Sequence, residues 1–377
     1  MKYVSTRGKA PVLTFEDVLL TGLARDGGLY VPESWPTFEA EEIRDLRGLT
    51  YAEMAVAVML PYVGAAVTES ELADIVDASY AGFGHGAVAP LKQIGPDQWL
   101  LELFHGPTLA FKDYAMQFLG RMFEHVLTQR GERVVIVGAT SGDTGSAAIE
   151  AFRGREAVDI FILHPKGRVS EVQRRQMTTV LADNVHNIAV EGTFDDCQDL
   201  VKALFNDLAF RDEMRLSAVN SINWARIMAQ TVYYFWAAVS LGAPDRPVAF
   251  SVPTGNFGNV FAGYVAQAMG LPVDRFIIGS NSNDILTRFF ESGAMAMAPV
   301  VPTLSPSMDI QVSSNFERLL FELYGRDGAE ITRIMTEFRD TGQFTIDGSL
   351  LQEARELFRG FSRDDAETSA TIAAMYA

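Results

Sequence analysis

Short apolar runs alternate with segments of helical periodicity from about residue 130 onward. The runs are nearly continuous and partly β-branched, as expected of strands that are buried on both faces. They are RVVIVGA (133–139), VDIFILHP (158–165), VHNIAVEG (185–192), RLSAVNS (215–221), PVAFSVP (247–253) and RFIIGSN (275–281). This strand–helix alternation predicts the α/β class with parallel sheets, and the chain length favours two such domains.

The first 95 residues follow a different pattern. Turn signals such as Pro32 precede two stretches with apolar residues at helical spacing, 51–63 and 69–83. We therefore expect a small, mostly helical N-terminal domain at 1–95 and an α/β catalytic region of two subdomains at 96–377. The final stretch, 351–377, is interpreted as helix, polar break and helix, without a closing strand.

Composition and charge narrow the classes of function. A net charge of −17 disfavours binding to nucleic acid or to an anionic membrane surface. Cys197 is the one cysteine and the five histidines lie far apart, so we expect neither disulfides nor a metal site. The sequence has no signal-peptide pattern and no apolar run of membrane-spanning length, which favours a cytoplasmic protein. The oligomeric state is left open.

Lys112 is the candidate nucleophile. It lies in FHGPTLAFKD (104–113), where Gly106 and Pro107 break regular structure and Lys112 opens an amphipathic helix. Apolar neighbours and the positive end of the helix dipole both disfavour the charged form, which lowers the pKa of the amine. Such an amine can attack a carbonyl and form a Schiff base. The alternative is an ordinary surface lysine near a helix start.

A glycine-rich turn, GATSGDTGSAAI (138–149), follows one predicted strand and opens a predicted helix. A strand–loop–helix turn of this kind can bind an anion through its N–H groups, and Thr140, Ser141 and Thr144 add hydroxyl donors. The alternative is a plain turn in which Ser141 or Asp143 caps the helix.

A second turn, PTGNFGN (253–259), repeats this design after the strand PVAFSV. It matches neither a Walker loop nor the GxGxxG dinucleotide fingerprint, which disfavours nucleoside triphosphates and NAD. Its backbone N–H groups could surround a phosphate, and they belong to Gly255, Asn256, Phe257, Gly258 and Asn259.

A third candidate anion site begins at Asn220, in NSINWARIMAQTVYYFWAAV. This segment is apolar nearly all round, so we expect a buried helix with Arg226 near its start. A buried cation there opposes the helix dipole and requires a negative partner. Ser221, Asn223 and Arg226 together could hold a phosphate. The alternative is a structural ion pair with an aspartate or glutamate.

Two further segments carry weaker signals. Ser314 and Glu317 have the spacing of a capping box, so SPSMDIQVSSNFERLLFEL (305–323) is interpreted as a loop followed by a capped helix. Asn281 and Asn283 follow a predicted strand at its carboxyl end, where α/β proteins place their sites. Either asparagine is therefore a candidate for the lining of a pocket.

One lysine, two glycine-rich helix starts and one cationic helix start suit a phosphate-bearing aldehyde cofactor and an anionic amino-acid substrate. That combination points to pyridoxal phosphate. The sequence resembles the threonine synthase family, within the tryptophan synthase β-like (fold type II) group of pyridoxal-phosphate enzymes. The matching pieces run through nearly the whole chain in the family's order and are TRG…GLARDGGLYVP, FHGPTLAFKD, GATSGDTGSAAI, NSINWARI, PTGNFGN and SPSMDIQVSSNFERLLFE.

The resemblance implies two α/β domains with a cofactor cleft between them. It implies a reaction of O-phospho-L-homoserine with water that gives L-threonine and phosphate by γ-elimination and β-addition. Lys112 would bond the cofactor aldehyde and shuttle protons, and the turn 255–259 would hold the cofactor phosphate. The loop with Thr140, Ser141, Asp143 and Thr144 would lie over the cofactor ring and bind the substrate carboxylate. The substrate phosphate would be bound by Ser221, Asn223 and Arg226.

Two features depart from the family pattern. Many relatives have asparagine in place of Asp143, where its amide bonds the cofactor's ring oxygen. An aspartate would face a partial negative charge there unless it is protonated or turned away. Family members also usually continue past this chain's end, into a strand and a serine or threonine that bonds the pyridine nitrogen. We therefore expect a truncated C-terminus, an open ring-nitrogen side and weak or no activity, which a comparison of turnover with a longer chain tests.

Two other functions remain open at this point. A serine/threonine dehydratase or β-replacement enzyme of the same group would share Lys112 and the phosphate turn, but it would not need Arg226. A non-catalytic relative that binds a phosphate ligand would keep the fold without the reaction.

Overall fold

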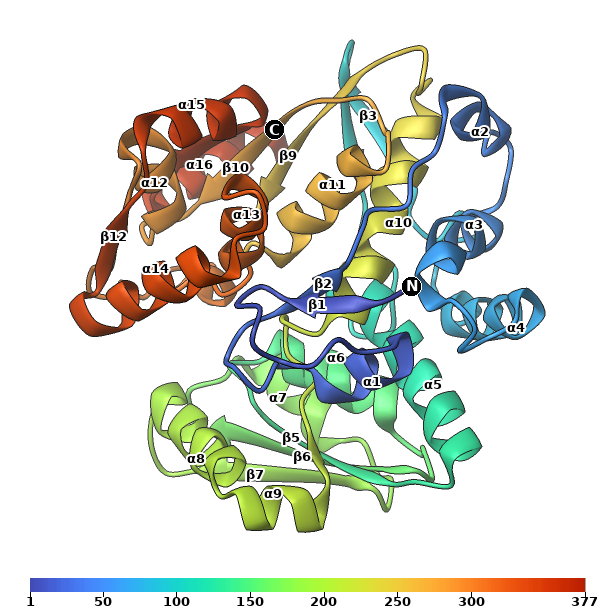
Figure 1. The fold of residues 1–377 in the computed structure, drawn as a ribbon, viewed down its shortest axis with the longest axis vertical. Helices are drawn as coiled ribbons and strands as arrows, with labels where there is room; N and C mark the ends of the chain where they lie inside the picture. The colour runs from blue at the N-terminus through green and yellow to red at the C-terminus, as the bar shows by residue number, and fades with distance from the viewer. Residues whose placement is uncertain (377) are drawn as a thin grey trace. The chain divides into compact units, whose positions relative to one another are not determined.

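The computed structural model describes residues 1–376. They form two compact units. The first comprises Met1–Tyr3, Leu13–Leu23 and Leu46–Ala237, and the second comprises Val4–Val12, Ala24–Asp45 and the residues from Ala238 onward. Each unit has its own parallel sheet, as the alternating pattern predicts (Figure 1). The N-terminal residues are shared between the units, and the domain boundary at residue 95 stays a prediction.

The first unit is built on a four-stranded parallel sheet in the order β7-β6-β5-β8. All four strands coincide with predicted runs. The expected burial holds for the centre of the sheet, where Ile136, Ile160 and Ile162 are buried, and not for the edge strand β7, where Ile188 is 44% exposed. The central pair is in continuous register from Val134 opposite Val158 to Ala139 opposite Leu163. The strands are β5 (Val134–Ala139), β6 (Val158–Pro165), β7 (Val185–Val190) and β8 (Leu216–Ser217).

The helices of the first unit begin with α1 and end with α10. The longest, α5, starts at Lys112 as predicted and ends at Arg130. Gly131 caps it in a left-handed conformation with φ of +63°, and its N–H bonds the Leu127 carbonyl. An antiparallel hairpin joins β3 (Leu91–Gly95) to β4 (Gln98–Leu101). The helices are α1 (Phe15–Thr21), α3 (Tyr51–Val63), α4 (Glu69–Tyr80), α5 (Lys112–Arg130), α6 (Asp143–Phe152), α7 (Glu171–Thr178), α8 (Phe194–Asn206), α9 (Leu208–Met214) and α10 (Trp224–Ser240).

The second unit is built on a three-stranded parallel sheet in the order β13-β10-β9. Two small sheets accompany it, β1 with β2 and β11 with β12. The strands are β1 (Tyr3–Ser5), β2 (Tyr30–Pro32), β9 (Val248–Pro253), β10 (Val273–Ser280), β11 (Ala294–Ala296), β12 (Gln343–Thr345) and β13 (Phe358–Ser362). The helices are α2 (Ala40–Asp45), α11 (Gly258–Ala268), α12 (Ile285–Ser292), the short 3₁₀ helix η1 (Pro306–Met308), α13 (Phe316–Leu323), α14 (Gly328–Thr341), α15 (Gly348–Leu357) and α16 (Asp365–Tyr376).

Strand β13 corrects the prediction for the last segment, which was helix, polar break and helix. Between α15 and α16 the chain forms a strand that pairs in parallel with β10. Phe358 is buried and its ring stacks on Phe276 with 5.6 Å between centroids. Gly360 lies so close to α12 that a Cβ there would approach Thr287 Cα to 2.7 Å. Tertiary contacts of this kind override the helical periodicity of the local sequence.

The predicted capping box at Ser314 and Glu317 is also wrong. Helix α13 begins at Phe316 after Asn315, and no side chain caps it. Glu317 is buried and forms an ion pair with Arg7, at 3.0 Å between Oε2 and Nη2. The Ser314 hydroxyl instead donates to Asn256 Oδ1 at 3.3 Å. The side chains that a capping box would have used are thus bonded to residues more than fifty positions away in the sequence.

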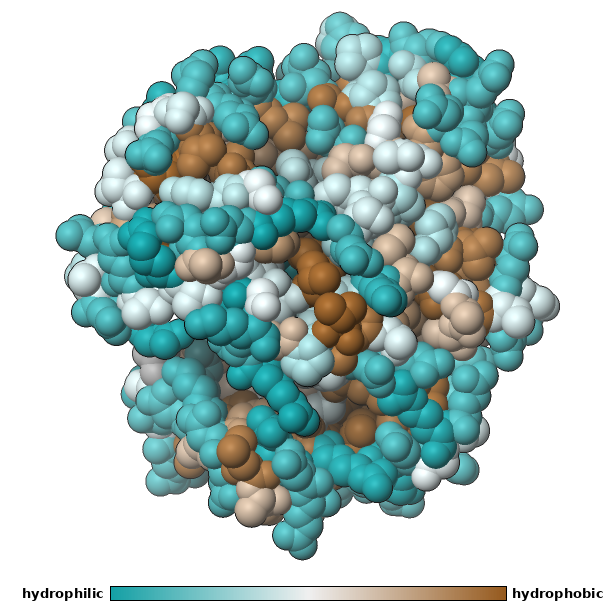
Figure 2. All heavy atoms as spheres, in the orientation of Figure 1, coloured by the Kyte–Doolittle hydropathy of each residue, from teal (hydrophilic) through white to brown (hydrophobic). Residues whose placement is uncertain are grey.

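Both glycine-rich turns lie where a parallel strand ends and a helix begins. Strand β5 leads into α6, and β9 leads into α11. The face of the molecule drawn in Figure 2 is largely hydrophilic, with hydrophobic side chains gathered in small patches. No helix within residues 1–376 combines the length and the apolar character that crossing a bilayer requires.

Candidate active site

Lys112 and Asp143 are the first residues of α5 and α6, and their side chains meet. Lys112 Nζ lies 2.5 Å from Asp143 Oδ2, and the two side chains are 14% and 18% exposed. Burial lowers the pKa of Lys112 below its ordinary value, and the charge of Arg226 acts in the same direction. The Asp143 carboxylate opposes both effects on that pKa. The predicted lowering of the amine pKa is confirmed, and Asp143 is the counter-ion of Lys112.

Asp113 fixes the loop that leads into Lys112. Its carboxylate is fully buried and accepts hydrogen bonds from the Thr108 N–H at 2.8 Å and the Thr108 hydroxyl at 2.7 Å. A Cβ on Gly106 would lie 2.4 Å from Asp113 Cβ, so only glycine fits at that position. Burial raises the pKa of Asp113. Asp113 was not among the predicted site residues, because an acidic residue in the first turn of a helix is common and does not by itself indicate a buried role.

Thr140 organises the turn between β5 and α6. It is buried, and its Oγ1 accepts hydrogen bonds from the Gly142 N–H at 3.0 Å and the Gly145 N–H at 2.9 Å. Neither Ser141 nor Asp143 caps α6, because Gly142 is the N-cap and makes no side-chain bond. A Cβ on Gly142 would lie 2.0 Å from Gln173 Oε1, and its φ of +150° also disfavours other residues. Ser141 and Thr144 lie in the same turn and are both partly exposed.

Arg226 lies in the first turn of α10 and is 2% exposed. Its Nη1 donates to the Val219 carbonyl at 3.1 Å, whereas its Nε is buried and has no partner. Burial lowers the pKa of Arg226 to about 10, against the opposing influence of the Asp143 carboxylate. Within residues 1–376 this guanidinium forms no ion pair, so the alternative of a structural pair is not met. A buried cation with an unused donor is suited to an anionic ligand.

Asn223 has structural partners that the sequence did not reveal. Its Nδ2 donates to the Leu19 carbonyl at 2.8 Å, and its Oδ1 accepts from the Ala225 N–H at 3.0 Å. The side chain therefore joins the start of α10 to α1, and one amide N–H remains for a ligand. Ser221 precedes it in a turn and is partly exposed.

The turn 255–259 lies in the second unit, between β9 and α11. Phe257 adopts a left-handed conformation with φ of +61°, which costs about 1–2 kcal/mol for a residue with a Cβ. Its buried ring packs against Phe316 at 5.1 Å and Phe358 at 5.8 Å, and this packing maintains the strained backbone. Helix α11 starts at Gly258, so the first N–H groups of that helix have no partner within it.

Asn281 and Asn283 are buried and belong to one polar network, and their place in the lining of a pocket stays a prediction. Asn281 Nδ2 donates to Asp309 Oδ1 at 2.7 Å, and Asn283 Nδ2 donates to the same oxygen at 3.1 Å. Thr303 Oγ1 donates to that oxygen as well, at 2.6 Å. This network fastens the segment after β11 to the end of β10.

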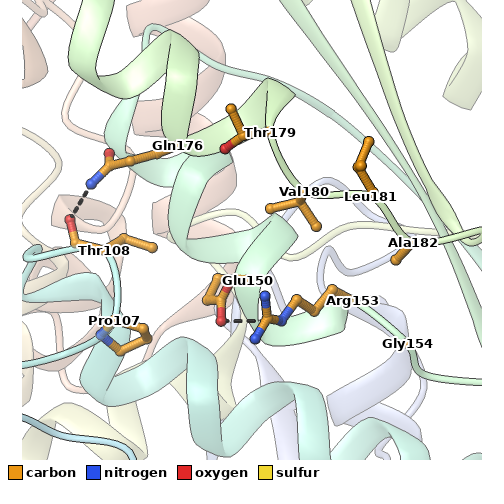
Figure 3. A pocket seen from close by; sticks show the side chains of 10 residues that line it. All are labelled: Pro107, Thr108, Glu150, Arg153, Gly154, Gln176, Thr179, Val180, Leu181 and Ala182. Atoms are coloured by element: carbon orange, nitrogen blue, oxygen red, sulfur yellow. Dashed lines mark hydrogen bonds and ion pairs between the residues drawn. The ribbon is translucent and has the colours of Figure 1, made fainter.

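A hollow of about 520 Å³ in the first unit lies beside the loop that Asp113 fixes (Figure 3). Gln176 Nε2 reaches from α7 to the Thr108 carbonyl at 2.9 Å at one end of this hollow. Its walls also contain the ion pair of Glu150 and Arg153. None of the predicted cofactor or substrate residues lines it. The hollow is therefore separate from the group around Lys112.

The residues present fit a phosphate-bearing aldehyde in three respects. Lys112 is a dry amine whose pKa is lowered, as an amine that bonds an aldehyde requires. The turn 255–259 brings a left-handed residue and a helix N-terminus together, which is the geometry of an anion-binding nest. Arg226 offers a second anion a buried, unused donor. Lys112 and Arg226 belong to the first unit, and the turn 255–259 belongs to the second.

Comparison with known proteins agrees with this chemistry. A family model described as "Threonine synthase N terminus" matches residues 2–80, and one described as "Pyridoxal-phosphate dependent enzyme" matches residues 87–337. The chain is 59% identical to a threonine synthase of Pseudomonas aeruginosa over 376 residues, which covers 100% of this chain and 80% of that protein.

Solved structures give the same result. A pyridoxal-phosphate-bound threonine synthase from Brucella melitensis is 60% identical, with a TM-score of 0.97 over 100% of this chain and 81% of that one. Threonine synthase from yeast is 42% identical, with a TM-score of 0.94 over 100% of this chain and 79% of that one. Sequence and fold therefore agree over the full length of the chain, and this chain belongs to the threonine synthase family of pyridoxal-phosphate dependent enzymes.

Proposed function

We propose that this chain converts O-phospho-L-homoserine and water to L-threonine and phosphate, with pyridoxal phosphate as cofactor. One observation carries the choice of substrate. The guanidinium of Arg226 is buried with a free Nε and is electrostatically coupled to Asp143 and Lys112. A substrate that carries a phosphate would neutralise this cation beside the reactive amine.

Lys112 is the residue to which the cofactor's aldehyde is bonded in this proposal. When bound, pyridoxal phosphate supplies an electron sink that stabilises negative charge on the substrate's carbon atoms. When it is not bonded to the aldehyde, Lys112 Nζ would remove and return protons at the substrate's Cα and Cβ. A lysine with a lowered pKa suits this role because it is uncharged for a larger fraction of the time.

Asp143 is the counter-ion that holds the Lys112 amine in place in this proposal. Its Oδ2 already lies at hydrogen-bond distance from Nζ, and its Oδ1 accepts from the Thr144 N–H at 2.8 Å.

The remaining residues bind the three anionic groups. We assign the substrate carboxylate to the turn that contains Thr140, Ser141 and Thr144. The substrate phosphate is assigned to Arg226 with Ser221 and the free N–H of Asn223. The cofactor phosphate is assigned to the backbone of the turn 255–259. A cytoplasmic location is part of the same proposal, since Cys197 is a free, buried thiol.

Product analysis tests the proposal. Incubation with O-phosphohomoserine and pyridoxal phosphate should yield equal amounts of threonine and phosphate, measured by chromatography and a phosphate assay. Borohydride treatment of the cofactor-loaded protein should add the reduced cofactor's mass to the peptide that contains Lys112. A colourless protein without that added mass would favour a non-catalytic binding protein.

The dehydratase alternative predicts a different response at one residue. Arg226→Ala should reduce kcat/KM for O-phosphohomoserine by at least about a hundredfold, because truncating a buried charge partner costs about 3–5 kcal/mol. The same change should leave turnover of serine or threonine nearly unaffected if those are the true substrates. Loss with the phosphorylated substrate alone therefore separates the two functions.

A further inference from the structure

The segment that precedes α13 donates hydrogen bonds to two carbonyl groups of the turn 255–259, those of Gly255 and Asn256. Ser313 Oγ donates to the Gly255 carbonyl at 2.7 Å. The Asn315 N–H donates to the Asn256 carbonyl at 3.1 Å. The side chain of Ile310 packs so closely that a Cβ on Gly255 would lie 3.1 Å from it. All of these contacts lie within the second unit.

Asn315 is itself held by a buried arginine. Its Oδ1 accepts a hydrogen bond from Arg318 Nη1, and both residues are 0% exposed. Arg318 also donates from Nε and Nη2 to the Tyr30 carbonyl, at 3.1 and 3.0 Å. Arg318 therefore joins β2 to the residue that bonds the turn.

Because the peptide bond is planar, a hydrogen bond that fixes a carbonyl group also fixes the direction of the N–H group in the same peptide. The Gly255 carbonyl and the Asn256 N–H belong to one peptide plane, and the Asn256 carbonyl and the Phe257 N–H belong to the next. In a trans peptide the carbonyl and the N–H point in opposite directions. Two carbonyls drawn toward Ser313 and Asn315 therefore direct two successive N–H groups away from them, which is how a backbone nest receives an anion.

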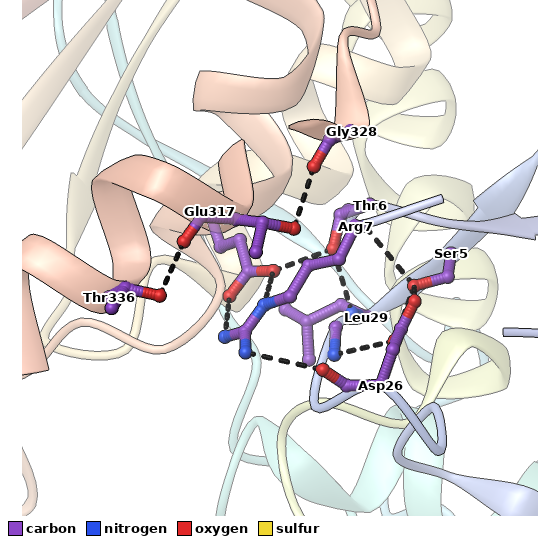
Figure 4. A network of polar contacts seen from close by, with 10 residues as sticks. Ser5, Thr6, Arg7, Asp26, Leu29, Glu317, Gly328 and Thr336 are labelled. Atoms are coloured by element: carbon purple, nitrogen blue, oxygen red, sulfur yellow. Dashed lines mark hydrogen bonds and ion pairs between the residues drawn. The ribbon is translucent and has the colours of Figure 1, made fainter. Parts of the chain in front are cut away.

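Helix α13 also makes a largely buried contact that does not reach the turn. Arg7 and Thr6 both bond the Glu317 carboxylate, and the Thr6 hydroxyl accepts from the Leu29 N–H at 2.8 Å (Figure 4). The Arg7 and Glu317 side chains are 12% and 7% exposed. This pair provides a control, because its loss perturbs the same helix without touching Gly255 or Asn256.

We propose that Ser313, Asn315 and Arg318 are positioning residues that aim the N–H groups of Asn256 and Phe257 at the cofactor phosphate. The inference rests on the proposed binding of that phosphate by the turn 255–259. It assigns a function to SPSMDIQVSSNFERLLFE, whose polar residues the reaction itself does not use. Asn315 Nδ2 is buried without a partner in the described structure, which leaves a further donor beside the turn.

The test compares two ligands that differ only in the phosphate. Pyridoxal phosphate and pyridoxal are titrated into cofactor-free protein, with absorbance of the bound aldehyde as readout. Ser313→Ala should weaken pyridoxal phosphate about fivefold, since a single hydrogen bond contributes about 1 kcal/mol. Arg318→Met should weaken it about tenfold or more, and neither change should alter pyridoxal affinity by more than about twofold.

Three comparisons make the outcome decisive. Equal weakening of both ligands by Ser313→Ala would mean a general structural defect and would overturn the inference, and this mild variant keeps the test available if Arg318→Met does not fold. Arg7→Met should lower thermal stability and leave the ratio of the two affinities unchanged. Asn259→Asp places a negative charge in the turn itself and should lower the ratio strongly. If Asn259→Asp leaves the ratio unchanged, the assignment of the cofactor phosphate to this turn fails. If Asn259→Asp lowers the ratio while Ser313→Ala and Arg318→Met do not, only the positioning role fails.

Discussion

Replacement of Asp143 by asparagine tests how strongly the Asp143 carboxylate raises the pKa of the Lys112 amine. The substitution keeps the shape and removes the negative charge that lies 2.5 Å from Nζ. Coulomb's law at that separation gives about 7 kcal/mol for an effective dielectric constant of 20 and about 2 kcal/mol in bulk water. Because both side chains retain some exposure, we take the lower figure as the working magnitude.

The sign follows from the surroundings of the amine. Burial and Arg226 lower the pKa of Lys112, and Asp143 alone among the contributing groups raises it. Without the carboxylate the pKa falls further, so more of the amine is uncharged at pH 7. A change of 1.4 kcal/mol is tenfold in an equilibrium, so the amine of Asp143→Asn should react at least about ten times faster at pH 7.

The assay is chemical labelling of the cofactor-free protein. Acetic anhydride in trace amounts is applied across pH 6 to 10, and acetylation of the Lys112 peptide is followed by mass spectrometry. The midpoint of the rate profile should move to lower pH in Asp143→Asn, with an unchanged plateau. Asp159→Asn, which removes an exposed partner of Arg133, should leave the profile unchanged. An unmoved midpoint, or one at higher pH, would refute the assignment of Asp143 as counter-ion.

Three further predictions concern buried groups. Arg226→Met should raise the free energy of unfolding at pH 7 by roughly 1–4 kcal/mol, because burial lowers the pKa of Arg226 to about 10 and an apolar side chain avoids the cost of the buried charge. The same change should abolish binding of O-phosphohomoserine, and calorimetry that finds a lower stability would contradict the reasoning. Gly142→Ala should cost about 1–3 kcal/mol in chemical denaturation and raise KM for the substrate, because the new methyl group meets Gln173 and the φ of +150° is strained. Gly106→Ala should displace Asp113, lower the free energy of unfolding by a similar amount, and slow the bonding of pyridoxal phosphate to Lys112 in stopped-flow absorbance. An unchanged rate would show that this loop does not position the Lys112 amine.

Local sequence determined most of the elements and one part of the chemistry. The six β-branched runs predicted the strands β5, β6, β7, β8, β9 and β10. The amphipathic pattern placed the start of α5 at Lys112. Apolar neighbours and the helix start predicted a lowered pKa for that amine, and the burial that the fold gives Lys112 is the main cause of the lowering. The glycines of both turns marked the strand-to-helix junctions correctly.

Local sequence failed wherever a polar group has a distant partner. Ser314 and Glu317 have the spacing of a capping box, yet their partners are Asn256 and Arg7. Periodicity predicted helix where β13 forms, since pairing with β10 and the stacking of Phe358 outweigh local preference. Such energies depend on which segments meet, and spacing within one segment carries no record of that.

The pairing of Lys112 with Asp143 shows the same division between sequence and fold. Each residue was a candidate from its own motif, and the sequence left open whether the aspartate was protonated or turned away. Only the packing of α5 against α6 brings the two helix starts together and gives the amine its counter-ion. The sequence by itself determined which groups are reactive, and the tertiary structure decided which groups oppose each other, because electrostatic coupling depends on distance in space and not along the chain.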